Sequence, residues 1–144
     1  MLEESVTTPV YKPAITPLSF IEEAGTLSLP ESPPAVVAVI EAFREIHDPA
    51  AEPFLSRQLG NPDPELRRAA VLALGATRSP NAIRQLTPVA RDPDETVRSA
   101  VAAMLGNSGN VQANDALTRL AHDPSRAIAA IARQALEKLA QTER

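Results

Sequence analysis

The sequence contains no cysteine and no tryptophan, and its aromatic side chains come from only three phenylalanines and one tyrosine. Without cysteine the chain has no disulfide, no thiolate metal ligand and no thiol nucleophile. With so few aromatic residues, the core has to be built from alanine, leucine, valine and isoleucine. Such a core favours closely packed helices over a sandwich of strands.

Long apolar runs and a basic excess are missing as well. No stretch approaches the roughly 18 apolar residues that span a bilayer, and the start MLEESVTTPVYKP lacks the basic and apolar segments of a secretory signal. The net charge of −4 and the pI near 5.2 give no general attraction to nucleic acid or to anionic membranes. We therefore expect a cytoplasmic protein with no membrane partner, and nucleic acid is disfavoured.

The sequence does have an internal repeat, with a constant offset of 31 residues. Residues 61–75, NPDPELRRAAVLALG, align without a gap on residues 92–106, DPDETVRSAVAAMLG. Ten identities occur in this ungapped unit when it is followed to Ala90 and Ala121. The period continues weakly into residues 123–137 and back to about residue 33. A fixed period of this size indicates a stack of repeated units.

Each unit contains two stretches with apolar residues at helical spacing. Asp-Pro or Ser-Pro pairs at 48–49, 63–64, 79–80, 92–93 and 123–124 supply an N-cap acceptor followed by proline at the first helical position. We interpret Gly60, Gly75 and Gly106 as helix ends. The predicted helices lie at about 33–46, 50–59, 63–75, 80–91, 93–106, 112–121 and 124–140, to within a few residues at each end.

Residues 1–32 differ from the rest, because prolines at 9, 13, 17 and 30 preclude a long helix. We predict two parts: a partly flexible, proline-rich extension over 1–32 with a possible short helix at 17–25, and a repeat domain over 33–144.

The repeated residues carry a family resemblance. They are Ala82, Leu86, Val89, Ala90, Asp92, Pro93, Val97, Arg98, Ala100, Leu105 and Gly106. This unit resembles the short HEAT-like repeat of the phycobilisome lyase type. The resemblance implies an all-α fold, a short right-handed α-solenoid of about three to four helix pairs. It also implies a scaffold for protein binding, although some members attach or remove bilin chromophores and others hydroxylate deoxyhypusine with iron.

Arg98 resembles the interior ladder arginine of this family, which bridges adjacent repeats, and Arg67 is its counterpart one repeat earlier. The ladder stops at Ala129, which occupies the same register in the next unit. Asp63, Asp92 and Asp123 are predicted caps at helix starts, with Asp94 and Glu95 in a first turn where the helix dipole favours negative charge. We interpret all these charges as structural.

Candidate binding residues lie elsewhere. Arg68, Arg126 and Arg133 are predicted on the exposed side of the second helices, which line the concave face in such solenoids. They could bind an acidic protein segment through bidentate guanidinium contacts. The alternative is an ordinary solvated helix face.

Catalytic and metal sites find little support. The sequence has no Gly-x-Ser-x-Gly, no glycine-rich phosphate loop and no paired carboxylates in an apolar setting. The separation of His47 and His122 is not a multiple of the period, and the iron-dependent relatives need several His-Glu pairs. We expect no metal and no cofactor. The leading hypothesis is a non-enzymatic scaffold that binds another protein through its concave face or its N-terminal arm; the alternative is a bilin lyase-related or chromophore-handling subunit.

Overall fold

The computed structural model of the chain describes residues 33–143, and its regular elements there are all helical. The long helices are α2 (Pro33–Ile46), α4 (Pro64–Thr77), α6 (Glu95–Ser108) and α8 (Arg126–Thr142). The short helices are α3 (Glu52–Gln58), α5 (Pro80–Leu86) and α7 (Asn114–Leu120). Single 3-10 turns adjoin them: η2 (Pro49–Ala51), η3 (Thr87–Arg91) and η4 (Val111–Ala113). The prediction of a short α-solenoid is confirmed.

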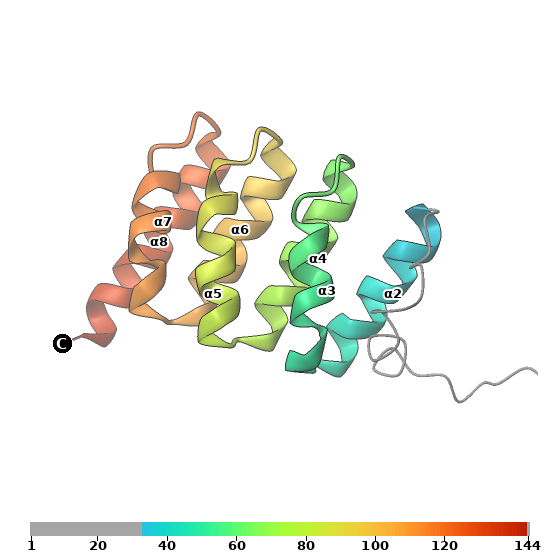
Figure 1. Ribbon diagram of the computed structural model, residues 1–144. Coiled ribbons are helices and arrows are strands. Elements are labelled where there is room, and N and C mark those ends of the chain that lie inside the picture. Colours follow the sequence, from blue (N-terminus) through green and yellow to red (C-terminus); the bar gives the residue numbers. More distant parts are fainter. Residues whose placement is uncertain (1–32, 144) are drawn as a thin grey trace, which may run out of the picture.

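The helices form two layers that follow the chain from one end of the stack to the other (Figure 1). In the long-helix layer, α4 packs between α2 and α6, and α6 packs between α4 and α8. In the short-helix layer, α3, α5 and α7 each contact the long helix that follows them in sequence. Each unit is therefore a short helix paired with a long one, and α2 precedes the first pair.

The core lies between the two layers and consists largely of alanine, leucine, valine and isoleucine, as predicted. Small alanines such as Ala73 and Ala102 are fully buried and allow the long helices to approach closely. The one aromatic pair found within residues 33–143, Phe43 and Phe54, packs edge to face with ring centroids 5.6 Å apart. Both rings are buried, and they fill the space between α2 and α3.

The long helices end in the same way at intervals of one period. His47, Arg78 and Gly109 follow α2, α4 and α6, and all three have left-handed backbone, with φ of 57°, 54° and 64°. The hydroxyls of Thr77 and Ser108 donate to carbonyls three residues back, at 2.8 and 2.7 Å. A left-handed residue after the last turn reverses the chain toward the next short helix.

The predicted glycine ends are wrong for two of the three positions. Gly75 and Gly106 lie inside α4 and α6, which continue to Thr77 and Ser108. A Cβ on Gly75 would lie 2.4 Å from Cγ of Met104, and one on Gly106 would lie 3.0 Å from Cβ of Ala135. These glycines are therefore sites of close helix packing, each against the next long helix along the stack.

The starts of two helices differ slightly from the predicted ones. α6 and α8 begin at Glu95 and Arg126, two residues later than the sequence indicated, so Pro93 and Pro124 lie in the preceding loops. The cause is a competing use of the aspartates before these prolines, described below. By contrast, α4 and α5 begin at Pro64 and Pro80, directly after the N-caps Asp63 and Ser79.

The stretch 80–91 divides into α5 and the turn η3 because of Pro88. Proline has no N–H to donate to the carbonyl four residues back, which ends the α-helix. The chain continues as a 3-10 turn from Thr87 to Arg91. The predicted extension over 1–32 and its helix at 17–25 lie outside the described residues.

Candidate functional site

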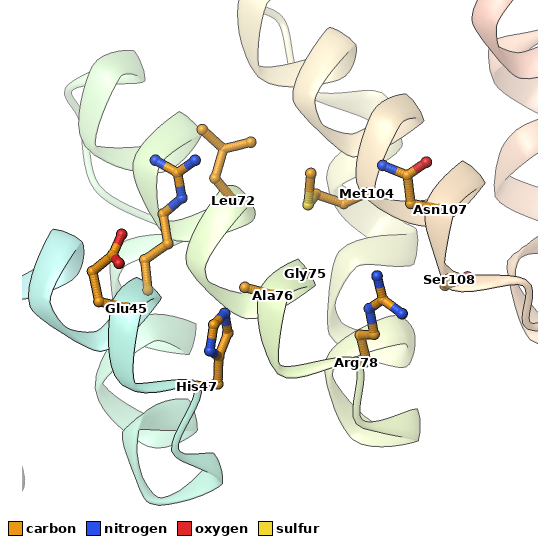
Figure 2. A pocket seen from close by; sticks show the side chains of 10 residues that line it. Glu45, His47, Leu72, Gly75, Ala76, Arg78, Met104, Asn107 and Ser108 are labelled. Carbon is orange, nitrogen blue, oxygen red and sulfur yellow. The ribbon is translucent and has the colours of Figure 1, made fainter.

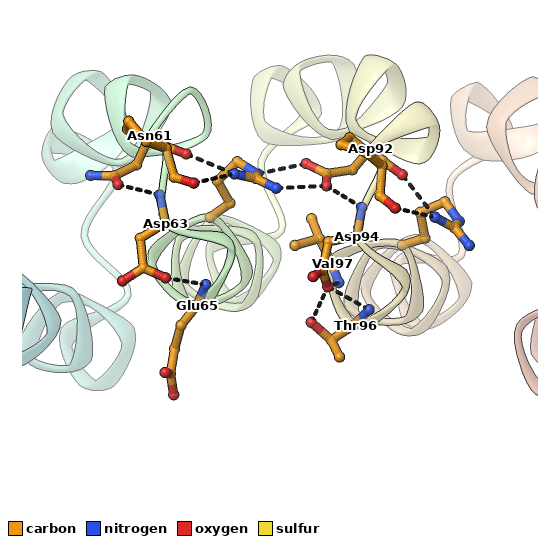
Figure 3. Close-up of polar contacts among 11 residues, drawn as sticks. Asn61, Asp63, Glu65, Asp92, Asp94, Thr96 and Val97 are labelled. Carbon is orange, nitrogen blue, oxygen red and sulfur yellow. Dashed lines mark hydrogen bonds and ion pairs between the residues drawn. The ribbon is translucent and has the colours of Figure 1, made fainter.

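The charged joint between repeats is built on Arg67 and Arg98, which lie one period apart on α4 and α6. Nε of Arg67 donates to Oδ2 of Asp92 at 2.8 Å, and Nη2 donates to Oδ1 at 3.0 Å. Arg98 repeats the fork on Asp123, with distances of 2.7 and 3.3 Å. Figure 3 shows the first of these forks between neighbouring units.

The remaining nitrogen of each guanidinium holds the loop of its own repeat. Nη1 of Arg67 donates to the carbonyls of Asn61 and Pro62 at 2.9 and 3.1 Å. Nη1 of Arg98 donates to the carbonyls of Asp92 and Pro93 at 2.9 and 3.2 Å. One side chain thus fixes the loop before its own helix and the loop before the next long helix (Figure 3).

Asp92 and Asp123 are therefore ladder acceptors, and the prediction that they cap helices is wrong. Oδ1 of Asp92 accepts from the backbone N–H of Asp94 at 2.9 Å, which forms a tight turn in the loop. The N-cap of α6 is Asp94, whose carboxylate accepts from the N–H groups of Thr96 and Val97. Glu95 is consequently the first helical residue, not the third.

Asp63 does cap its helix. Its carboxylate accepts from the N–H of Glu65 at 2.9 Å, at the start of α4. Asp63 lies one period before Asp94, and Asn61 lies one period before Asp92. Asn61 keeps the turn, since its Oδ1 accepts from the N–H of Asp63 at 2.9 Å.

The first acceptor position of the ladder is neutral for a physical reason. One period before Arg67 stands Val36, which is buried in α2 and has no charge to offer. An aspartate at position 61 would lack an arginine from the preceding long helix, and asparagine avoids that partly buried charge. At the other end, Ala129 replaces the arginine on α8 and is buried.

The ion pairs perturb the acid–base chemistry of their own members. Hydrogen bonding to Asp123 raises the pKa of Arg98, and the same bond to Arg98 holds the pKa of Asp123 below its ordinary value. Hydrogen bonding to Asp92 likewise raises the pKa of Arg67. All of these shifts favour the charged forms, so these groups are held as fixed ions and are unsuited to proton transfer.

A groove runs over the long-helix layer and is made of two adjoining hollows that share Leu72. The first has a volume of about 350 Å³ and lies across the ends of α2, α4 and α6 (Figure 2). Its polar lining includes Arg44, His47, Arg78 and Asn107. Its floor includes Gly75 and Met104, the close contact between α4 and α6.

The second hollow, of about 470 Å³, continues between α4, α6 and the start of α8. Arg68 and Glu95 line its rim, while Ala100, Ala103 and Ile128 give it an apolar base. We call the two hollows together the long-helix groove. No sequence motif marked it, because it arises from small residues on separate helices.

The predicted binding arginines fall on this layer but do not converge. Arg68, Arg126 and Arg133 are all exposed. Arg68 lines the groove, whereas Arg126 lies between two lining residues, Ser125 and Ala127, and Arg133 lies about two turns further along α8. Of the three, Arg68 alone is part of the groove lining.

A second polar joint was not predicted. Glu52 is buried at the start of α3, where its carboxylate accepts from the hydroxyl of Ser79 and from Nδ2 of Asn81, the latter at 2.7 Å. Periodicity gave no signal, since one period later the position is the apolar Ile83. Glu52 ties the first short helix to the second.

The two histidines have local roles. His47 occupies the left-handed position after α2, and Nδ1 of His122 lies 3.0 Å from the carbonyl of Thr118 on α7. Over residues 33–143, no group of three or more histidine, aspartate or glutamate side chains is arranged to hold a metal ion. No helix in this part of the chain has the length and apolar character needed to cross a membrane.

Comparison with known proteins gives the family. The model of HEAT repeats matches residues 29–95 and 58–137, which together cover most of the chain. A search of curated proteins finds no match. The matched residues span the stacked pairs and the ladder described above. The chain therefore belongs to the HEAT-repeat family.

Proposed function

We propose that the protein is a non-enzymatic scaffold that binds another protein along the long-helix groove. The observation that carries this proposal is the continuity of the two hollows across α2, α4, α6 and α8, which share Leu72. A segment of a partner protein needs an elongated surface, and stacked repeats provide one without a deep pocket. HEAT repeats generally mediate protein–protein contacts, which agrees with this use.

The chemistry of the groove suits a segment with both apolar and acidic side chains. Leu72 and Met104 are only partly buried and are available for apolar contact. Arg68 lines the groove and can form a bidentate bond to a carboxylate, and Arg126 lies beside the lining at the start of α8. Burial of the apolar base would supply affinity, and the arginines would fix the orientation of the segment.

A groove-filling substitution tests the proposal. Ala103 is partly buried in the apolar base, and its replacement by arginine would fill the hollow without entering the core. We expect Ala103→Arg to lose partners that the tagged native protein retains on purification from its own cells, measured by quantitative mass spectrometry. The matched control is Gln112→Arg, which adds the same charge at an exposed position of the short-helix layer.

Retention of every partner by Ala103→Arg would remove the groove from the proposal. Binding through the N-terminal arm would then be tested by deleting residues 1–16, a segment outside the described residues. If that deletion abolishes binding while helical content is kept, the arm is the binding element. The bilin-related alternative stays a prediction, and bound pigment after co-expression with a bilin and an apo-phycobiliprotein would support it.

A further inference from the structure

The opposite layer carries a second charged groove that the scaffold proposal does not use. It lies between α5 with its turn η3 and the neighbouring helix α7, which stand side by side in Figure 1. Its volume is about 480 Å³. The lining residues are Arg84, Thr87, Pro88, Arg91, Asp115, Ala116 and Arg119. We call it the arginine groove.

Its lining carries more positive than negative charge. Arg84, Arg91 and Arg119 are all exposed, and Asp115 is the one carboxylate in the lining. The ion pairs found among residues 33–143 join other residues: Arg44 with Glu41, Arg67 with Asp92 and Arg98 with Asp123. These ion pairs include no groove arginine. Arg84 donates from Nη2 to Oδ1 of Asn81 at 3.3 Å, whereas the ladder arginines donate to a carboxylate and to backbone carbonyls.

The position of these arginines does not follow from the repeat itself. One period before Arg84 and Arg91 stand Pro53 and Gly60, and one period after them stand Asp115 and His122. Arg119 aligns with Pro88 one period earlier. The stacking of units requires no arginine at these places, and convergence on one groove is a property of this pair of repeats.

We propose that the arginine groove binds an acidic, carboxylate-rich segment of a partner protein. Three guanidiniums around an open groove can each form a forked bond to a carboxylate, and successive acidic side chains of an extended segment could engage them in turn. Ala116 and Pro88 give the floor a short apolar strip against which the backbone of the segment can lie. Charge complementarity is the argument for this occupant.

Nucleic acid fits the groove less well. None of its lining residues is aromatic, so there is no platform for base stacking. Asp115 and the net charge of −4 oppose a nucleic acid and an acidic peptide alike, so the missing stacking platform is the feature that favours the peptide.

The test measures binding of a fluorescein-labelled, glutamate-rich peptide of about ten residues to the full chain by fluorescence anisotropy. Salt is kept at about 0.15 M so that charges beyond roughly 8 Å are screened. The triple variant Arg84→Glu, Arg91→Glu and Arg119→Glu is expected to raise Kd by at least about thirtyfold. Asp115→Asn is expected to lower Kd by about twofold to fivefold, because it removes the one repulsive charge.

The matched control places the same charge change on exposed positions that line neither groove, with Arg57→Glu on α3 and Gln134→Glu, Lys138→Glu and Gln141→Glu on α8. This variant has the same net charge as the groove variant and should keep the Kd of the peptide within about threefold of the native value. Equal losses in the two variants would overturn the proposal, because the peptide would then respond to overall charge. This test does not depend on the scaffold proposal, which is tested separately by the loss of partners from the Ala103→Arg variant of the long-helix groove.

Two further outcomes would also overturn the assignment. A single-stranded RNA oligonucleotide that binds more tightly than the peptide, and that loses binding in the groove variant, would make phosphate the ligand. The chain itself has five glutamates and one lysine in residues 1–32. If changing those glutamates to glutamine in the full chain tightens peptide binding by more than about tenfold, the occupant is the chain's own acidic segment and not a partner.

Discussion

At the scale of single residues, each ladder arginine holds together three pieces of chain. Arg98 uses Nε and Nη2 on the carboxylate of Asp123 and Nη1 on the carbonyls of its own loop. The side chain of Asp123 is only 4% exposed, so its charge depends on this partner. Removing the arginine leaves the buried carboxylate without its charged partner, with the N–H of Ser125 still bonded to it, and takes the side-chain donor from two carbonyls.

We therefore expect Arg98→Ala to lower the free energy of unfolding by about 2–4 kcal/mol, the cost of breaking a largely buried ion pair from one side. Chemical denaturation followed by circular dichroism measures this. The control is Arg126→Ala on the exposed side of α8, expected to change stability by no more than about 0.5 kcal/mol. Equal effects of the two substitutions would show that the ladder contributes nothing specific.

The same ion pair predicts a dependence of stability on pH. Bonding to Arg98 lowers the pKa of Asp123 in the folded protein. A carboxyl with a lowered folded pKa contributes stability that is fully present above its unfolded pKa of about 3.9 and is lost as pH falls through the folded value. We expect the free energy of unfolding of the native protein to fall more steeply between about pH 5 and 3 than that of Asp123→Asn.

Denaturation at a series of pH values gives both curves. Native protein and Asp123→Asn should differ most near neutral pH and converge at the acidic end. Curves that stay parallel down to about pH 3 would contradict the linkage and assign the stability of this joint to contacts other than the carboxylate charge.

The sequence indicated the ladder arginines, but it did not indicate that Asp92 and Asp123 are the acceptors of their hydrogen bonds. The constant offset between repeats places Arg67 and Arg98 in equivalent positions. It does not reveal that Asp92 serves an arginine from the preceding unit, because that pairing is set by how consecutive units stack. An Asp-Pro pair has the local signature of a helix cap. In the folded chain, however, the carboxylate of Asp92 is bonded to Arg67 of the preceding unit, and α6 is capped by Asp94 instead.

At the scale of helices, close packing at glycine decides how neighbouring long helices meet. Gly75 on α4 faces Met104 on α6, and Gly106 on α6 faces Ala135 on α8. Helix propensity alone favours alanine over glycine by about 1 kcal/mol inside a helix. At these two positions the higher helix propensity of alanine opposes the steric clash that its Cβ would cause. The sign of the change in unfolding free energy on substitution by alanine shows which effect is larger.

We expect Gly75→Ala to destabilise the protein by about 1–3 kcal/mol despite the better propensity. The new Cβ would lie 2.4 Å from Cγ and 2.6 Å from Cβ of Met104, and the latter cannot rotate away. Gly106→Ala should cost less, because its nearest neighbour is 3.0 Å away. Melting temperatures and denaturation curves measure the series.

Gly60→Ala is the control for that series. A Cβ there would meet only the carbonyl of Arg57 at an ordinary 3.8 Å, and the residue is not among those with left-handed backbone. The substitution should be neutral or stabilise the protein by up to about 1 kcal/mol. A Gly75→Ala variant as stable as Gly60→Ala would mean that α4 and α6 separate at little cost.

The existence and order of the helices could be predicted from the 31-residue period and from the Asp-Pro and Ser-Pro pairs. Some helix boundaries could not. Glycine near the end of an apolar stretch is the ordinary signal of a helix end, but Gly75 and Gly106 serve packing inside α4 and α6. The actual ends fall at His47 and Arg78, and left-handed backbone is uncommon for any residue other than glycine, so these residues were not recognised as helix ends. The long-helix groove escaped prediction for a related reason: it depends on the distance between helices.

At the scale of the whole molecule, stability should behave as a chain of nearest-neighbour terms. Each long helix contacts the long helices before and after it, and the main polar bonds between units are the forks of Arg67 and Arg98. Distant units such as α2 and α8 have no substantial contact. A fold of this kind can open at one joint while the remaining units stay paired.

Hydrogen exchange of the Arg98→Ala variant tests this directly. Arg98 joins α6 to the loop before α8, so its loss should release the last pair, α7 and α8. We expect amide exchange in α7 and α8 to accelerate by at least about tenfold, with a smaller change in α3 and α4. Arg67→Ala weakens the earlier joint, between α4 and the loop before α6, and should accelerate exchange on both sides of it. An equal acceleration in all helices of both variants would contradict the nearest-neighbour description, because it would show that the stack unfolds as one cooperative unit.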